Sequence, residues 1–120
     1  MAVVAQSSHT RAIRAPISQV AARLQDVLGQ RLAAVIAGVS DAKAVGQWAR
    51  GTRAPHPEAE RRLRDAYQVV DLLLAHDGPE TIRAWFGGMN PHLGDRAPAL
   101  LIETEPEHVL QAARAFVANG

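Results

Sequence analysis

The amino-acid sequence predicts an all-α protein, and three observations support this prediction. Apolar residues recur at helical spacing along most of the 120 residues. Hydrophobic residues make up 48% of the chain and aromatic residues only 4%, a composition that suits short, closely packed helices better than a β-sandwich. No segment shows a convincing alternating pattern of a strand.

Length and composition limit the class of protein further. The chain is long enough for one compact domain with a real core, but too short for two large ones. It has no cysteine, which excludes disulfides and thiolate metal sites and favours a reducing compartment. No apolar run approaches the roughly 18 residues of a membrane span, and the first residues do not resemble a signal peptide. We therefore expect a cytoplasmic protein that makes no use of a membrane.

The N-terminal part of the chain begins without a helical period. Residues 1–15 are polar, and we expect them to form a flexible N-terminal arm. A first helix is expected over 17–28, where Gly29 ends the apolar run. A second apolar cluster, at 32–36, ends at Gly38.

The third and fourth helices carry clear boundary signals. Ser40 stands where an N-cap is expected for a helix that runs to Gly51, because its hydroxyl can accept a bond from an unsatisfied amide. The fourth helix is expected to begin at His56-Pro57, since proline is tolerated in a first turn. Its long apolar stripe ends at Gly78.

The remaining elements are short. We expect a helix over 79–87, a turn-rich connector over 90–98 and an apolar patch over 99–102. Thr104 and Glu107 have the spacing of a capping box, in which each side chain satisfies the other's backbone donor. This box predicts a last helix that continues to the C-terminal end.

The two apolar clusters on either side of Gly38 have the spacing of a helix-turn-helix, whose second helix can lie in the major groove of DNA. Val45 and Trp48 are expected to face the core, while Lys43 and Gln47 project from the other side, where they could donate to guanine and pair with adenine. The candidate DNA-binding residues are Ser40, Lys43, Ala44, Gln47, Arg50 and Arg53. An ordinary helical hairpin with a solvated basic face is the alternative.

Charge divides the chain into two halves. Residues 1–64 hold ten basic and four acidic residues, a balance of +6, and residues 65–120 hold three basic and eight acidic residues, a balance of −5. A basic half suits a polyanion and an acidic half is repelled by it. We therefore divide the chain into the arm, a DNA-binding region over 16–64 and a second helical region over 65–120. Solvated surface charge explains the division equally well.

Two series of residues carry a resemblance to known families. The segment from Gly38-Val39-Ser40 through Trp48-x-x-Gly51-x-x-x-Pro55 resembles Xre (Cro/cI-like) repressors. The ordered series Trp85-Phe86, Asn90-x-x-Leu93, Pro98, Leu100-Leu101 and Thr104-Glu105 resembles the toxin-binding domain of Xre/MbcA/ParS antitoxins. Together the resemblance covers roughly residues 17–120.

The resemblance implies a type II antitoxin that forms a homodimer, binds the operator of its own operon and covers the active-site entrance of a RES-domain toxin. The NAD-consuming activity belongs to that toxin partner. Region 65–120 would then serve dimerisation and toxin binding. The candidate toxin-binding residues are Asn90, Leu93, Ala115, Phe116, Asn119 and Gly120. Within this set, the residues from Ala115 to Gly120 are favoured as toxin contacts, because a chain terminus is free to enter a cleft.

Each candidate in region 65–120 also has a structural interpretation. We expect Trp85, Phe86, Leu100 and Leu101 to belong to the core or to a dimer interface rather than to contact a toxin. Asn90 can form a turn, since its side chain can accept bonds from its own backbone.

The sequence does not favour an enzyme. Its five histidines lack the spacing of a metal site, and no phosphate loop or nucleophile elbow is present, so we expect no cofactor, no metal and no catalysis. Two alternatives to an antitoxin stay open: a stand-alone dimeric helix-turn-helix repressor, and a protein-binding module whose helix-turn-helix is vestigial.

Overall fold

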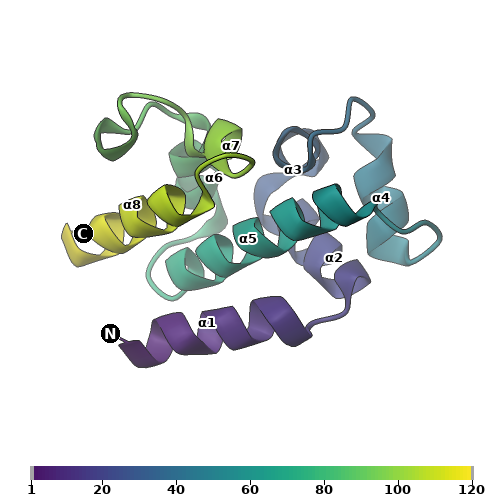
Figure 1. Cartoon of the computed structure of the whole chain (residues 1–120), viewed down its shortest axis with the longest axis horizontal. Helices are drawn as coiled ribbons and strands as arrows, with labels where there is room; N and C mark the ends of the chain where they lie inside the picture. Colours follow the sequence, from purple (N-terminus) through teal and green to yellow (C-terminus); the bar gives the residue numbers. More distant parts are fainter. Residues whose placement is uncertain (1, 120) are drawn as a thin grey trace.

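A computed structural model of the protein describes residues 2–119, with side chains from Ser8 onward (Figure 1). Within this range the chain forms eight α-helices, one 3-10 turn and no strand, so the predicted all-α class is confirmed. A single isolated bridge joins Asn90 to Arg96 in the described part of the chain.

The N-terminal segment differs from the prediction. Where we expected an arm without regular structure, helix α1 (Ala2–Arg14) lies along helix α5 (Pro57–Leu74) in Figure 1. Ala12 is buried in the interface between them. The prediction over 1–15 is wrong because the contacts that hold this helix come from far along the chain rather than from its own apolar period.

Several polar contacts link α1 to α5. Arg64 Nη1 donates to the carbonyl oxygens of Ala12 at 2.9 Å and of Ala15 at 2.7 Å. One guanidinium thus binds backbone carbonyl groups that have no partner within the helix at the C-terminal end of α1. Arg11 Nε donates to the buried Asp71 carboxylate at 2.7 Å. Both interactions join α1 to α5.

Three helices follow that form the predicted helix-turn-helix region. They are α2 (Ile17–Leu28), α3 (Gln30–Ala37) and α4 (Lys43–Arg50). α2 packs against α3, α4 and α5. α3 ends at Gly38, which has the left-handed conformation, with φ 78°, that glycine adopts without strain.

The start of α4 is not capped as we predicted. Helix α4 begins at Lys43, and the Asp41 carboxylate, rather than the Ser40 hydroxyl, accepts the Lys43 amide at 3.0 Å. This is an Asx turn, in which a carboxylate binds the backbone two residues on. The Ser40 N-cap prediction is therefore wrong.

Helix α5 begins as predicted. His56 is its N-cap, and the His56 Nδ1 accepts the Ala59 amide at 3.2 Å. The helix ends at Leu74, four residues before Gly78. The expected boundary between residues 64 and 65 thus falls in the middle of a continuous helix, so it does not separate two domains.

The C-terminal elements surround the far end of α5. They are α6 (Pro79–Gly87), the 3-10 turn η1 (Pro91–Leu93), α7 (Pro98–Leu101) and α8 (Pro106–Asn119). Among the described residues Thr104 makes no capping bond, and the predicted capping box is wrong. Pro106 disfavours helical geometry at the residue before it, so the helix begins one position too late for Thr104 to cap it.

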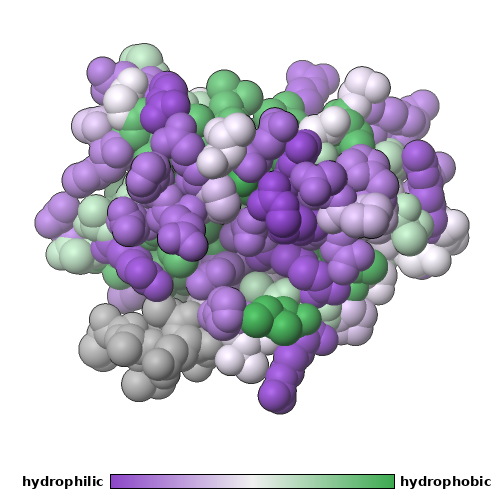
Figure 2. Space-filling view, viewed as in Figure 1, coloured by the Kyte–Doolittle hydropathy of each residue, from purple (hydrophilic) through white to green (hydrophobic). Residues whose placement is uncertain are grey.

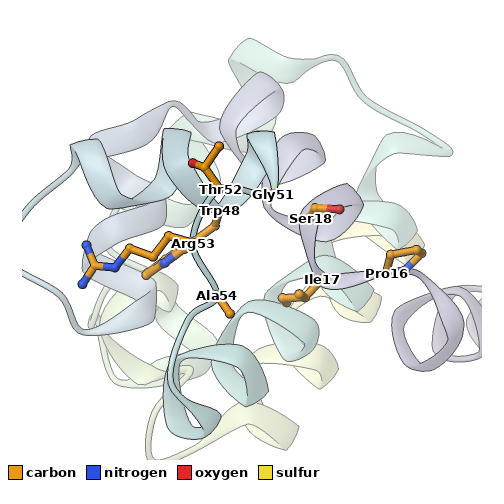
Figure 3. A pocket seen from close by; sticks show the side chains of 8 residues that line it. All are labelled: Pro16, Ile17, Ser18, Trp48, Gly51, Thr52, Arg53 and Ala54. Atoms are coloured by element: carbon orange, nitrogen blue, oxygen red, sulfur yellow. The ribbon is translucent and has the colours of Figure 1, made fainter.

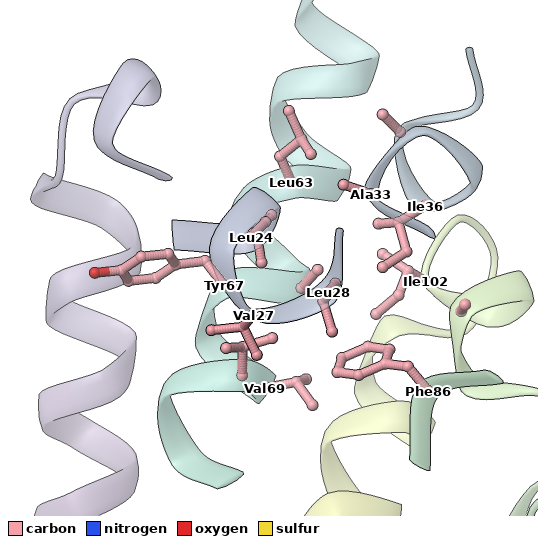
Figure 4. Packing of buried hydrophobic residues seen from close by; sticks show 14 of the residues in the cluster. Leu24, Val27, Leu28, Ala33, Ile36, Leu63, Tyr67, Val69, Phe86 and Ile102 are labelled. Atoms are coloured by element: carbon pink, nitrogen blue, oxygen red, sulfur yellow. The ribbon is translucent and has the colours of Figure 1, made fainter. Parts of the chain in front are cut away.

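One hydrophobic core spans both predicted regions. In Figure 4 Leu28 of α2 and Ile36 of α3 lie near Phe86 of α6 and Ile102, which follows α7. Leu63 of α5 belongs to the same cluster. On the face in Figure 2 apolar residues appear only as small separate patches among hydrophilic ones. The chain therefore folds around one shared interior.

Candidate DNA-binding surface and partner-binding slot

The inward face of α4 locks this helix onto the core. Val45 is fully buried and Trp48 is 2% exposed, which confirms the predicted orientation. Ala44, which we predicted to face DNA, is also only 2% exposed, so that assignment is wrong. Ala44 lies one turn before Trp48 on the same side of the helix, and the buried stripe of this short helix is wider than the sequence pattern suggested.

The outward face of α4 carries the other predicted residues. Lys43 and Arg50 are exposed and Gln47, between them, is half-buried. These positions follow the i, i+4, i+7 spacing of one helical stripe. Ser40 and Arg53 are exposed at the two ends of the helix. The structure thus brings together five of the six predicted DNA-binding residues.

Gln47 is held by the segment that follows α4. Arg53 Nη1 donates to Gln47 Oε1 at 3.2 Å, and Thr52 Oγ1 donates to the Gln47 carbonyl oxygen at 3.2 Å. The bond from Arg53 orients the side-chain amide of Gln47 and uses only its oxygen, so the NH₂ group can still donate. Arg53, one of the candidate DNA-binding residues, therefore also orients the side chain of Gln47.

Ion pairing separates the basic residues of this half into two groups. Every arginine of α5 lies within 4 Å of a carboxylate: Arg61, Arg62 and Arg64. In the described part of the chain, four exposed cations of the helix-turn-helix have no such partner: Arg31, Lys43, Arg50 and Arg53. Two exposed acids, Asp26 and Asp41, lie in the same region. Among the described residues of segment 16–64, the cations without a carboxylate partner thus lie on α3, on α4 and just after α4, while Arg14 of α1 is a further exposed cation without one.

Sequence reasoning missed Arg31, although a signal for it exists. Arg31 lies in the first turn of α3, the first helix of the helix-turn-helix, and is exposed. In known helix-turn-helix proteins the first helix of the motif crosses the DNA backbone, so a cation at this position is the type of residue that binds phosphate there.

A cleft flanks the end of α4. It has a volume of about 360 Å³ and lies between the start of α2, at Pro16 and Ser18, and the loop 51–54 (Figure 3). The first turn of α2 has no acidic residue and no side-chain cap. Its free amides therefore face an environment without competing negative charge.

A second slot lies at the other end of the molecule. It has a volume of about 410 Å³ and is lined by Trp85, Met89, Asn90, Pro91, His92, Ala112, Phe116 and Asn119. Three of the predicted toxin-binding residues, Asn90, Phe116 and Asn119, thus line one slot. Met89 was missed by sequence reasoning, although it is 81% exposed beside an aromatic wall. No periodic pattern marks a single exposed methionine in a loop.

The other predicted toxin-binding residues do not line the slot. Leu93 is 2% exposed, so its assignment as a contact is wrong and it belongs to the core. Ala115 is half-buried on α8 outside the slot. Gly120 lies outside the described residues.

Asn90 combines a structural role with its place in the slot wall. Its Oδ1 accepts the His92 amide at 2.9 Å, which confirms the turn suggested by the sequence. Its backbone carbonyl accepts the amides of Leu93 and Asp95, both at 2.9 Å. Asn90 therefore shapes the loop that forms one side of the slot.

The aromatic wall of the slot is packed against the interior of the C-terminal half. Trp85 packs edge-on against Phe86, with ring centroids 5.1 Å apart, and lies 6.4 Å from the ring of Phe116. The Trp85 indole Nε1 is buried without a hydrogen-bond partner. Leu100, in contrast, is 65% exposed on α7, so it does not belong to the core.

Two carboxyl groups near α8 have shifted pKa values. Burial raises the pKa of Asp65, against the opposing effect of Arg61. Hydrogen bonds from Arg96 and His108 lower the pKa of Glu105. Within residues 2–119 no group of three His, Asp or Glu side chains could hold a metal ion.

The searched helices also include none with the length and apolarity required to cross a bilayer. Comparison of the chain with protein-family models, with curated proteins and with solved structures gave no match.

Proposed function

We propose that the protein is an antitoxin that binds operator DNA through α4 and neutralises a RES-domain toxin through its C-terminal half, as a homodimer in the cytoplasm. The observation that carries the DNA-binding part is the stripe of Lys43, Gln47 and Arg50 on the outward face of α4. The two cations of this stripe, Lys43 and Arg50, have no carboxylate partner in the described structure, whereas the arginines of α5 are neutralised. Phosphate neutralisation supplies much of the affinity of DNA-binding proteins.

The toxin-binding part is supported by the motif series from Trp85 to Glu105 and by the slot that three of its candidate residues line. The two surfaces lie far apart. Figure 1 shows α4 at one end of the long axis, which measures 40 Å, and the end of α8 at the other. The two candidate surfaces therefore share no residue.

DNA binding is tested with the upstream region of the protein's own gene. A good base contact contributes about 1–3 kcal/mol, so Lys43→Ala should weaken operator binding by roughly 5- to 150-fold. Arg83→Ala is the matched control, because Arg83 is an exposed cation of α6 without a carboxylate within 4 Å in the described structure. Equal affinities of the two variants in fluorescence anisotropy would refute the assignment of α4.

Arg53→Ala should have two effects in the same assay. Loss of a phosphate contact should make the salt dependence shallower by about one unit of slope. Because Arg53 also holds Gln47, we expect a reduced preference for the operator over unrelated DNA as well.

Toxin neutralisation is tested by expressing the full chain together with a RES-domain toxin. Co-expression should restore growth and cellular NAD⁺, and truncation after Phe116 should abolish this rescue because it removes Asn119 from the slot wall. Lys43→Ala should rescue fully, since Lys43 lies on α4. The alternative, a stand-alone repressor, is favoured if the full chain binds its operator but neutralises no such toxin.

A further inference from the structure

We propose that Glu103, in the C-terminal half, is a positioning residue for the helix-turn-helix. Through Arg62 it fixes the end of α3 and the turn that leads into α4. The consequence for DNA rests on the proposed function, whereas the link between Glu103 and the turn is a property of the fold.

Arg62 is the residue of α5 that contacts the turn directly. Its side chain is 14% exposed, and its Nη1 donates to the carbonyl oxygen of Ala37 at 3.3 Å. Ala37 is the last residue of α3, so its carbonyl oxygen accepts no hydrogen bond from an amide of the same helix. The guanidinium also lies against Gly38, where an added Cβ would collide with Arg62 Nη1. Arg62 thus caps the C-terminal end of α3 with a side chain that comes from α5.

Glu103 holds Arg62 in that position. Glu103 Oε1 lies 3.1 Å from Arg62 Nη2. The loop that carries Glu103 is held separately, because Arg61 Nη2 donates to the Glu103 carbonyl oxygen at 3.2 Å. Neutralising the Glu103 side chain therefore leaves its backbone attached to α5.

A second carboxylate competes for the same guanidinium. Glu58, one turn earlier on α5, lies 3.9 Å from Arg62 Nη2. Without the charge of Glu103, Glu58 is the nearest remaining counter-charge, and it draws Arg62 along α5. Arg62 Nε is buried without a hydrogen-bond partner, so no bond from that atom opposes the movement.

The turn transmits this movement to the candidate DNA surface. Only residues 38–42 separate the end of α3 from the start of α4, where Lys43 is the first residue. A shift at Ala37 therefore changes the position from which Lys43 and Gln47 project. The C-terminal half contributes to DNA recognition although it lies outside the contact surface.

The test compares Glu103→Gln with Glu105→Gln in the full chain. Glu105 is the matched control, because its partners Arg96 and His108 both belong to the C-terminal half. The first readout needs no DNA: hydrogen exchange of the Gly38 and Val39 amides, which donate to the Ala34 carbonyl oxygen. We expect exchange about 3- to 10-fold faster in Glu103→Gln and unchanged in Glu105→Gln.

The second readout is operator affinity, which Glu103→Gln should weaken by about 3- to 10-fold. Arg62→Lys should have the same effect, since one ammonium cannot reproduce the fork of a guanidinium, and adding Glu103→Gln to it should cause little further loss. Circular dichroism establishes that each variant is folded.

Equal exchange rates in the two glutamine variants would refute the link between Glu103 and the turn. Faster exchange with unchanged operator affinity would refute the positioning role. If the unmodified protein binds no DNA, the proposed function fails, and the exchange rates still decide whether Glu103 holds the turn.

Discussion

Gly38 offers a measurement of what Arg62 contributes to the turn. Gly38 and Gly51 are the C-caps of α3 and α4, and both are left-handed, with φ of 78° and 75°. An alanine at either position incurs strain of about 1–2 kcal/mol and restricts the unfolded chain equally. A Cβ at Gly51 meets no atom within 4 Å, whereas a Cβ at Gly38 must displace Arg62.

The displacement of Arg62 determines how much more Gly38→Ala should destabilise the protein than Gly51→Ala. It removes the hydrogen bond to Ala37, with a net contribution of about 1 kcal/mol, and weakens the ion pair with Glu103, worth at most about 1 kcal/mol because Glu103 is exposed. Gly38→Ala should therefore lower the free energy of unfolding by about 2–4 kcal/mol, against about 1–2 kcal/mol for Gly51→Ala.

Urea denaturation at equilibrium measures the free energy of unfolding of both variants. In thermal denaturation, each kcal/mol of destabilisation should lower Tm by about 3–6 °C. Arg62→Ala should remove the difference between the two glycine positions. Equal destabilisation by the two alanines in the presence of Arg62 would refute the reasoning, because strain alone would then account for both.

Further predictions concern the core, the slot and the acidic loop. Phe86→Ala should lower the free energy of unfolding by about 3–5 kcal/mol, because Phe86 is fully buried in the shared core, whereas Met89→Ala should change it by less than about 0.5 kcal/mol. Met89→Ala should still weaken co-purification with the toxin, and normal binding would exclude the slot. The pKa of Glu105 in the folded protein is lower than its ordinary value of 4.5, so the charged carboxylate stabilises the fold. This stabilisation is complete above pH 4.5 and is lost as the pH falls through the lowered pKa. Glu105→Gln should therefore make thermal stability less sensitive to acidification below that pH, which scans at several pH values would detect, and an unchanged pH profile would contradict this account.

The sequence was sufficient to predict elements whose stability comes from their own pattern. Apolar periodicity gave α2, α4 and α5, and Gly38 and Gly51 ended their helices where expected. The predicted inward positions of Val45 and Trp48 followed from the same periodicity and are confirmed.

Elements that depend on distant partners could not be predicted in this way. Helix α1 is held by Arg64 and Asp71, which lie about fifty or more residues away in sequence, so nothing within its own segment marks it. Similarly, Asn90, Phe116 and Asn119 were selected individually, and only the packing of α8 beside η1 brings them to one slot.

The continuity of α5 constrains how this protein can be recombined with others. A chimaera that exchanges its C-terminal half at residue 64 would join two unrelated segments within one helix. The turn at 75–78, after α5 ends, is the crossover point that keeps every helix whole. Even there, an incoming α6 must present a side chain that fits the core cluster in which Phe86 lies near Leu28, so the C-terminal half can be exchanged only together with its share of the core.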